Sequence, residues 1–97
     1  MGMRSTTVDA TTRGLLAWNE RRTAWSIFNG GANTVYISQD AANVDRDGVP
    51  LAPGAALEAS LYDGDEPQLA VYAVAPGGAT PVRIIEQFGE VIARVRV

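Results

Sequence analysis

Apolar and polar side chains alternate at every second residue in a series of short segments, which is the pattern of half-buried β-strands. Clusters of Gly, Pro, Asn and Asp separate these segments, as turns do in all-β proteins. No apolar stripe with a 3.6-residue period reaches the length of a helix. The pattern predicts an all-β fold, namely a small antiparallel β-sandwich or jelly-roll-like barrel of about six to eight short strands. The predicted strands are residues 23–29, 34–38, 57–61, 68–75, 82–88 and 90–97.

The clearest local signal comes from residues 23–29 and 34–38. In the first segment, Trp25 and Ile27 fall on the same face of a strand. The Asn- and Gly-rich stretch between the two segments, residues 29–33, tolerates the positive φ that a tight reversal needs. Together these features predict a β-hairpin.

A turn and a central strand are predicted further along the chain. Pro53-Gly54 suits the two middle positions of a type II turn, because Pro presets φ and Gly accepts a positive φ. Residues 68–75 alternate, yet both faces are largely apolar, with Val71 on one face and Val74 on the other. A strand that is apolar on both faces is expected in the middle of a sheet.

The length of 97 residues suits a single domain with one core. Residues 1–13 are rich in Ser and Thr and poor in large apolar side chains, so we expect an extended N-terminal arm there. A frayed terminus explains the same composition equally well. The single β-sandwich domain is then expected to comprise residues 14–97.

The composition excludes several kinds of active site. The chain has no Cys and no His, which removes thiolate and imidazole metal sites and also Ser-His-Asp or Cys-His catalysis. The net charge of −3 argues against a nucleic-acid-binding protein, which would show a basic patch. No apolar run approaches the roughly 20 residues that cross a membrane. The N-terminus also lacks the charged-then-apolar layout of a signal peptide.

Acidic side chains are the remaining candidates for catalysis or metal binding. Asp40, Asp45 and Asp47 share one loop, but no predicted helices flank it, as an EF-hand requires. Residues 63–66 form a plain acidic turn. Four carboxylates qualify as glycosidase candidates only because they are acidic: Glu58, Asp63, Glu66 and Glu86. We therefore expect no enzyme activity, and no catalytic, metal-binding or cofactor-binding residues.

Aromatic residues leave two interpretations open. They can form a stacking platform for a sugar or a nucleic acid, or they can pack in the core or in a subunit interface. Packing is the more frequent use of aromatics in strands. The residues concerned are Trp18, Trp25, Tyr36, Tyr62 and Tyr72.

The last predicted strand, residues 90–97, carries the clearest hint of a binding surface. Its apolar residues alternate with Arg94 and Arg96, and nothing in the sequence caps it. An apolar strand at a sheet edge pairs readily with another chain, whereas a strand inside its own sheet has no such role. The candidate subunit interface consists of Val91, Ala93, Arg94, Val95, Arg96 and Val97.

Five pieces of residues 22–86, in a fixed order, carry a family resemblance. They are Ile27-Phe28-Asn29, Val35-Tyr36-Ile37-Ser38, Gly48-Val49-Pro50-Leu51-Ala52-Pro53-Gly54, Val71-Tyr72-Ala73-Val74 and Val82-Arg83-Ile84-Ile85-Glu86. In this order the chain resembles small phage virion proteins of the capsid decoration or head-fibre-base type. The resemblance covers about two-thirds of the chain, and residues 87–97 depart from the pattern.

The resemblance implies a β-sandwich that decorates a capsid or forms the base of a head fibre or spike, often as a trimer. It brings no catalytic residues. We therefore expect a non-enzymatic structural protein of the virion, assembled in the host cytoplasm. Its expected partners are the major capsid protein, other virion subunits and copies of itself, with no nucleic acid and no membrane. The alternative is a carbohydrate-binding β-sandwich module that uses exposed aromatics.

Overall fold

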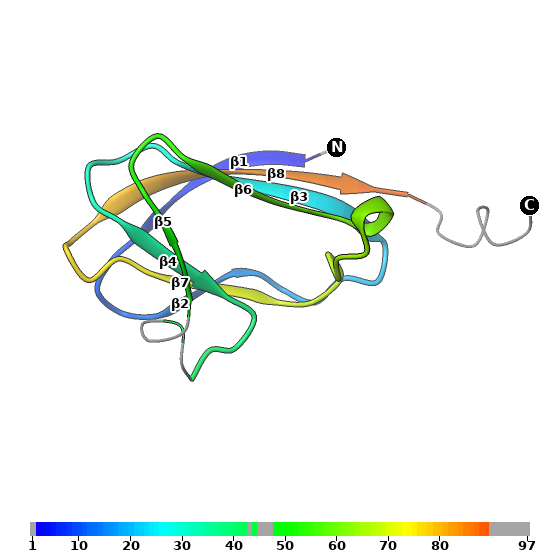
Figure 1. Cartoon of the computed structure of the whole chain (residues 1–97), viewed down its shortest axis with the longest axis horizontal. Coiled ribbons are helices and arrows are strands. Elements are labelled where there is room, and N and C mark those ends of the chain that lie inside the picture. Colours follow the sequence, from blue (N-terminus) through cyan, green and yellow to red (C-terminus); the bar gives the residue numbers. More distant parts are fainter. Residues whose placement is uncertain (1, 43, 45–47, 90–97) are drawn as a thin grey trace, which may run out of the picture.

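A computed structural model of the chain describes residues 2–42, 44 and 48–89 (Figure 1). Within these residues the fold is all-β, as predicted, and a single 3₁₀ turn is its labelled helical element. In chain order the elements are β1 (Gly2–Val8), β2 (Arg13–Leu16), β3 (Arg22–Asn29), β4 (Val35–Ser38), β5 (Val49–Leu51), β6 (Ala56–Ser60), η1 (Leu61–Asp63), β7 (Val71–Val74) and β8 (Thr80–Phe88).

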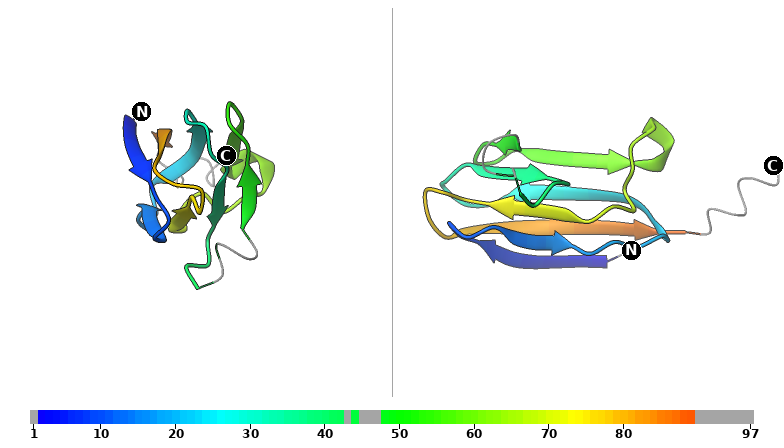
Figure 2. Two further views of the ribbon diagram at one scale, coloured as in Figure 1. Left: turned by 90° about the vertical axis from the view of Figure 1, so that its left-hand side faces the viewer. Right: turned by 90° about the horizontal axis from the view of Figure 1, so that it is seen from below.

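The strands form two antiparallel sheets that pack face to face, which confirms the predicted β-sandwich. The first sheet has the strand order β1-β8-β3-β6, and the second has the order β2-β7-β4-β5. Figures 1 and 2 show the two sheets as separate layers. Strands β1 and β2 are the edge strands on one long side of the sandwich, and β6 and β5 are the edge strands on the other long side.

The core lies between the sheets and is built from the inward-facing residue of each alternating pair. Ile27 and Ile84 from the first sheet and Val35 and Val71 from the second are fully buried. Val82 and Ala73 extend the same layer. Burying an aliphatic side chain of this size contributes about 1.5–3 kcal/mol, so the two-residue periodicity of the sequence accounts for the layering.

The predicted hairpin is wrong, because β3 and β4 belong to different sheets and do not pair. Asn29 explains the crossing. Its side chain is fully buried, and its amide nitrogen donates to the carbonyls of Asn33 and Leu51, each at 2.8 Å. Its amide oxygen accepts from the backbone of Gly31 at 3.0 Å. Asn29 thus satisfies the backbone of a loop that carries the chain from one sheet to the other.

The predicted turn and central strand are both confirmed. Gly54 has a φ of +82°, and the amide of Ala55 donates to the carbonyl of Ala52 at 2.9 Å, as a type II turn requires. Strand β7 lies between β2 and β4 in the second sheet. Val71 and Val74, which lie on opposite faces of this strand, are both buried.

An N-terminal arm was expected at residues 1–13, but Gly2–Val8 form strand β1 and Arg13 begins strand β2. Strand β1 pairs with β8 along its whole length, and Val8 is fully buried. Its Ser and Thr residues are suited to an edge strand with one solvent-facing surface, which is why the segment resembled an arm. The predicted last strand, residues 90–97, lies outside the residues that the structure describes.

Candidate functional site

One long side of the sandwich, between β1 and β2, is closed by an arginine. Arg4 of β1 donates from Nη2 to the carbonyl of Leu15 in the second sheet at 2.6 Å. Its Nη1 forms an ion pair with Glu86 of β8 at 2.5 Å. A single side chain therefore connects both sheets across this side.

Glu86 also contacts a second arginine, which is buried. Arg22 is 3% exposed, and its Nε lies 3.6 Å from the second oxygen of Glu86. The remaining nitrogens of Arg22 donate to the carbonyls of Pro67 at 3.2 Å and Ala17 at 2.9 Å. This arrangement makes Glu86 a buried structural anion.

The sequence analysis counted Glu86 among the acidic candidates and overlooked both arginines. A signal for its location was present, because Val82, Ile84 and Glu86 are two residues apart and therefore share a strand face. Since Val82 and Ile84 are fully buried, Glu86 faces the interior as well. A carboxylate in that position needs a cation, and Arg22 and Arg4 provide one each.

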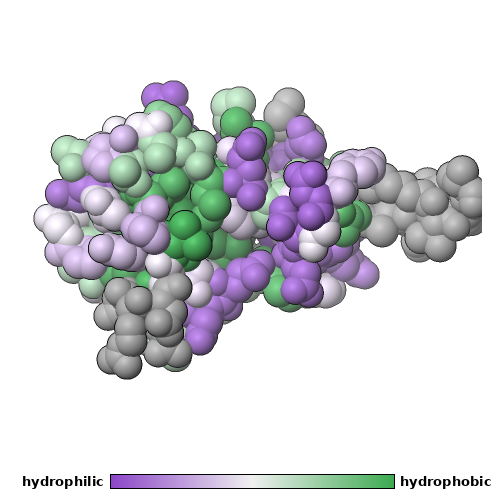
Figure 3. Space-filling model, in the orientation of Figure 1, coloured by the Kyte–Doolittle hydropathy of each residue, from purple (hydrophilic) through white to green (hydrophobic). Residues whose placement is uncertain are grey.

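The other long side, between β5 and β6, is open. These two edge strands belong to different sheets and do not pair. A cleft with a volume of about 350 Å³ lies between them. Figure 3 shows apolar surface exposed between the two sheets on this side, with hydrophilic side chains next to it. The cleft is lined by Trp25, Ile37, Ser38, Gln39, Val49, Leu57, Glu58, Ala59, Asp65, Glu66 and Val71.

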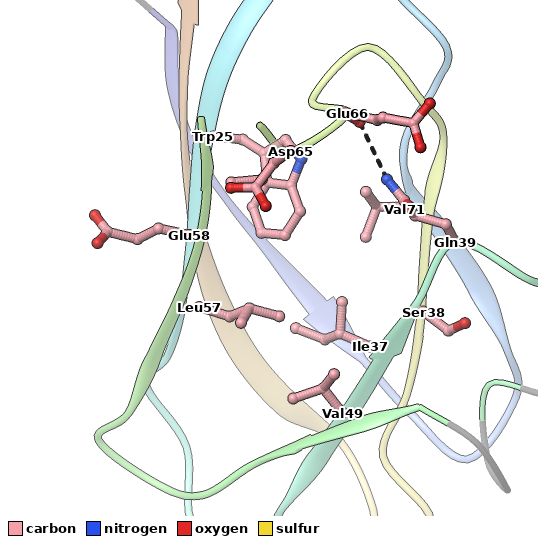
Figure 4. Close-up of a pocket in the computed structure, with 11 residues that line it drawn as sticks. Trp25, Ile37, Ser38, Gln39, Val49, Leu57, Glu58, Asp65, Glu66 and Val71 are labelled. Carbon is pink, nitrogen blue, oxygen red and sulfur yellow. Dashed lines mark hydrogen bonds between the residues drawn. The ribbon is translucent and has the colours of Figure 1, made fainter. Parts of the chain in front are cut away.

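The walls of the cleft are apolar and come from five strands. Figure 4 shows Leu57 of β6 and Val49 of β5 on opposite sides, with Ile37 of β4 between them. Trp25 of β3 is 6% exposed, and its indole nitrogen is buried without a hydrogen-bond partner. Burying an N–H without an acceptor costs about 1–3 kcal/mol. The wall of the cleft therefore contains one unsatisfied polar group.

The mouth of the cleft is acidic at one end. Asp65 accepts from the amide of Ser60 at 3.0 Å, which fixes its carboxylate beside β6. Glu66 is exposed, and its backbone carbonyl accepts from the side chain of Gln39 at 3.2 Å, which links the loop before β7 to the end of β4. Glu58 lines the same cleft, but Figure 4 shows its carboxylate pointing away from the interior. Within the part of the chain that the structure describes, no arginine lines this cleft.

The free edge of β6 adds a backbone feature to the open side. The carbonyl of Ser60 accepts from the amide of Asp65 at 3.2 Å, so the backbone groups of Ser60 point away from β3. In an antiparallel strand these groups alternate in direction from residue to residue. The amide and carbonyl of Glu58 and Ala56 therefore also point away from β3, along the open side.

A second hollow, of about 450 Å³, lies on the outer face of the first sheet. Small side chains such as Ala24, Ser26 and Ser60 form much of it, together with Ile85 and Gln87. The described surface also exposes large apolar side chains, namely Met3, Trp18, Phe28, Val49, Tyr62 and Phe88.

The aromatic candidates are distributed over different parts of the fold. Trp25 is in the core, whereas Tyr36 and Tyr72 are half-buried on β4 and β7. Trp18 is 60% exposed and Tyr62 is 72% exposed. Sequence analysis identified Trp25 as an aromatic candidate but did not predict the cleft, which depends on residues from six separate segments.

The acidic loop shows local hydrogen bonding. The carboxylate of Asp40 accepts from the amide of Ala42 at 3.0 Å, a turn interaction, whereas Asp45 and Asp47 lie outside the described residues. Among the described residues, no group of three or more His, Cys, Asp and Glu side chains is arranged for a metal ion. No helix in the described part of the chain has the length and apolar character needed to cross a membrane. The candidate interface residues Val91, Ala93, Arg94, Val95, Arg96 and Val97 lie outside the description as well.

Comparison with known proteins gives a similarity of fold. No protein-family model and no curated protein match the chain. A de novo designed double-stranded β-helix is similar with a TM-score of 0.62 and 13% identity, over 90% of this chain and 100% of that chain. A structure described under Bacillus endospore appendages that form disulfide-linked pili has a TM-score of 0.54 and 14% identity, over 92% and 85% of the two chains.

A third similar structure is dTDP-4-dehydrorhamnose 3,5-epimerase from Elizabethkingia anophelis NUHP1, with a TM-score of 0.51 and 10% identity. The match covers 96% of this chain but 53% of that chain, so this chain spans about half of the epimerase. At identities this low, the structural similarity shows a shared fold alone.

Proposed function

We propose that the protein is a non-enzymatic structural subunit of a phage or virus particle, which binds its neighbours through the surfaces of a β-sandwich. The observation that carries this proposal is the open β5–β6 side, where an apolar cleft lies beside an unpaired strand edge. Edge strands with free amides and carbonyls pair readily with another chain. On the opposite side, Arg4 connects the two sheets instead.

Two further observations support a structural role. The similar endospore-appendage structure belongs to pili, so the same architecture serves as an assembly unit there. The pieces that resemble phage virion proteins correspond to the end of β3, β4, β5 with its turn, β7 and most of β8. This chain has no Cys, so its proposed assembly forms without disulfides.

The proposed partners are the major capsid protein or other virion subunits, together with copies of the chain itself. We favour a trimer, located in the virion as a capsid decoration protein or a fibre base. Exposed Met3, on the edge strand β1, and Phe28, on the outer face of β3, offer additional apolar contact area.

Two measurements test the proposal. Sedimentation equilibrium of the full chain is expected to give a mass that is a multiple of the 10.3 kDa of one chain, with three the favoured multiple. Antibodies to the protein are expected to detect it in purified particles and not only in the soluble lysate. A strict monomer at high concentration that is absent from purified particles would contradict the proposal.

A carbohydrate-binding module is the second candidate, because Trp18 and Tyr62 each expose more than half of their surface. Aromatic rings at this exposure can stack on sugar rings. A glycan array tests it, with Trp18→Ala and Tyr62→Ala as paired variants. Retention of one sugar class by the parent chain, and its loss in both variants, supports sugar binding; an array without hits removes this candidate.

A further inference from the structure

We propose that the cleft between β5 and β6 receives residues 91–97 of a second copy of the chain as an added strand. This inference rests on the proposed function as a self-assembling subunit and deepens it, because it names both surfaces of the contact. The geometry of the cleft, the direction of the free backbone groups on β6 and the charge at the mouth each point to the same occupant.

The apolar side chains of the cleft match those of residues 91–97. The cleft offers a wall of Leu57 and Ala59 on β6 facing Val49 on β5. Its volume of about 350 Å³ suits side chains from one strand, not a folded domain. In the last segment, Val91, Ala93, Val95 and Val97 follow each other at two-residue spacing, so a single strand face presents four small apolar groups.

The second argument is the charge match. The exposed carboxylate of Glu66 and the carboxylate of Asp65 lie at the mouth, and none of the described residues that line the cleft is a cation. The segment carries Arg94 and Arg96 on the strand face opposite its valines. When the valines enter the cleft, these two guanidinium groups lie on the outer face of the first sheet, the face to which the carboxylate of Glu58 on β6 also points. Pairing of exposed charges sets the register and the salt dependence of a contact more than its strength.

The third argument is the backbone. The amides and carbonyls of Ala56 and Glu58 point toward the open side, where β6 has no neighbouring strand. A strand laid along this edge satisfies those groups and extends the first sheet by one strand. Its carbonyls also bring hydrogen-bond acceptors to a cleft whose wall contains the unpartnered indole N–H of Trp25.

Cysteine cross-linking provides the test, because the chain contains no Cys of its own. Val49, on the wall of the cleft, and Val95, in the segment, are each changed to Cys in separate full-length chains. One chain is isotope-labelled so that mass spectrometry distinguishes the mixed disulfide from the two symmetric ones. The mixed Val49→Cys and Val95→Cys product is expected to form about tenfold faster than either symmetric product, because docking raises the local thiol concentration.

Matched controls separate docking from random collision. Met3 is 74% exposed on β1, at the end of the first sheet opposite to β6. The variant Met3→Cys is therefore expected to give no excess of the mixed product with Val95→Cys. Glu66→Arg, at the mouth, is expected to slow the Val49–Val95 link several-fold. Glu58→Arg makes the same charge change on the outer face of β6, beside the two arginines of the added strand, and is expected to slow the link as well.

The outcomes distinguish this inference from the proposed function. Self-association in sedimentation without an excess of the mixed disulfide overturns the inference and leaves the structural role standing. A monomer with no mixed product overturns the inference, and absence of that monomer from purified particles contradicts the proposed function as well. A chain carrying Val49→Cys and Val95→Cys together that closes a disulfide within one monomer shows that the segment docks on its own cleft, which overturns the second-copy assignment.

Discussion

Replacing Glu86 with leucine should be among the most damaging single substitutions in this protein. The change leaves the guanidinium of Arg22 buried, at 3% exposure, with the carbonyls of Pro67 and Ala17 but without its anion. Removing one partner of a buried ion pair costs about 3–5 kcal/mol, because the other charge stays desolvated and unpaired. The half-exposed side chain of Arg4 can be hydrated, so the loss of the Arg4–Glu86 ion pair adds about 1 kcal/mol or less.

Urea unfolding measures this cost directly. Domains of this size have a net stability of about 5–15 kcal/mol. With a urea m-value of about 1–1.5 kcal/mol/M, a loss of about 3–4 kcal/mol lowers the midpoint by roughly 2–4 M. The m-value should remain unchanged, because the surface exposed on unfolding is the same. Glu58→Leu, at an exposed position on β6, is the matched control and should shift the midpoint little.

The double variant Arg22→Met with Glu86→Leu tests whether the unpaired charge of Arg22 causes the loss of stability. Replacing both members of a buried pair with apolar residues is often neutral or stabilising, although the carbonyl of Pro67 then loses its donor. The double variant is therefore expected to be more stable than Glu86→Leu alone. A loss below about 1 kcal/mol in Glu86→Leu would refute the reasoning, as would a double variant no more stable than the single one.

The sequence pattern predicts which residues face inward, but not which strands pair. Trp25 and Ile27 are on the buried face of β3, and Val35 and Ile37 are on that of β4, in agreement with the alternation. The two strands nevertheless lie in different sheets. A hairpin and a crossing loop share the same alternation and the same Asn- and Gly-rich linker, so the choice depends on a buried side chain, Asn29, bonding to a distant carbonyl.

Strand β1 was missed for a related reason. Val8 is its one large aliphatic residue that is buried, and Arg4 turns toward the interior because Glu86 is there to receive it. An inward arginine looks polar in a periodicity analysis, although here it belongs to the interior face. The cleft escaped prediction because its walls come from strands that are far apart in sequence, whereas the buried position of Glu86 follows from the alternation with Val82 and Ile84.

Three further predictions follow from single contacts. Ile84→Ala removes a fully buried side chain next to Ile27 and should cost about 2–5 kcal/mol in urea unfolding, with an unchanged m-value. Gly54→Ala puts a side chain at a φ of +82° and should lower stability by about 1–2 kcal/mol in thermal unfolding; an unchanged melting temperature would contradict the left-handed turn. The third concerns pH: the hydrogen bond from Arg13 holds the pKa of Asp9 below its usual 3.8. Because the folded pKa is the lower one, the stabilisation is fully present above about pH 4 and is lost as the pH falls through that lowered pKa. Asp9→Asn should therefore remove part of the acid destabilisation, and an NMR titration that places the Asp9 pKa at or above 3.8 would show that the Arg13 contact has no such effect.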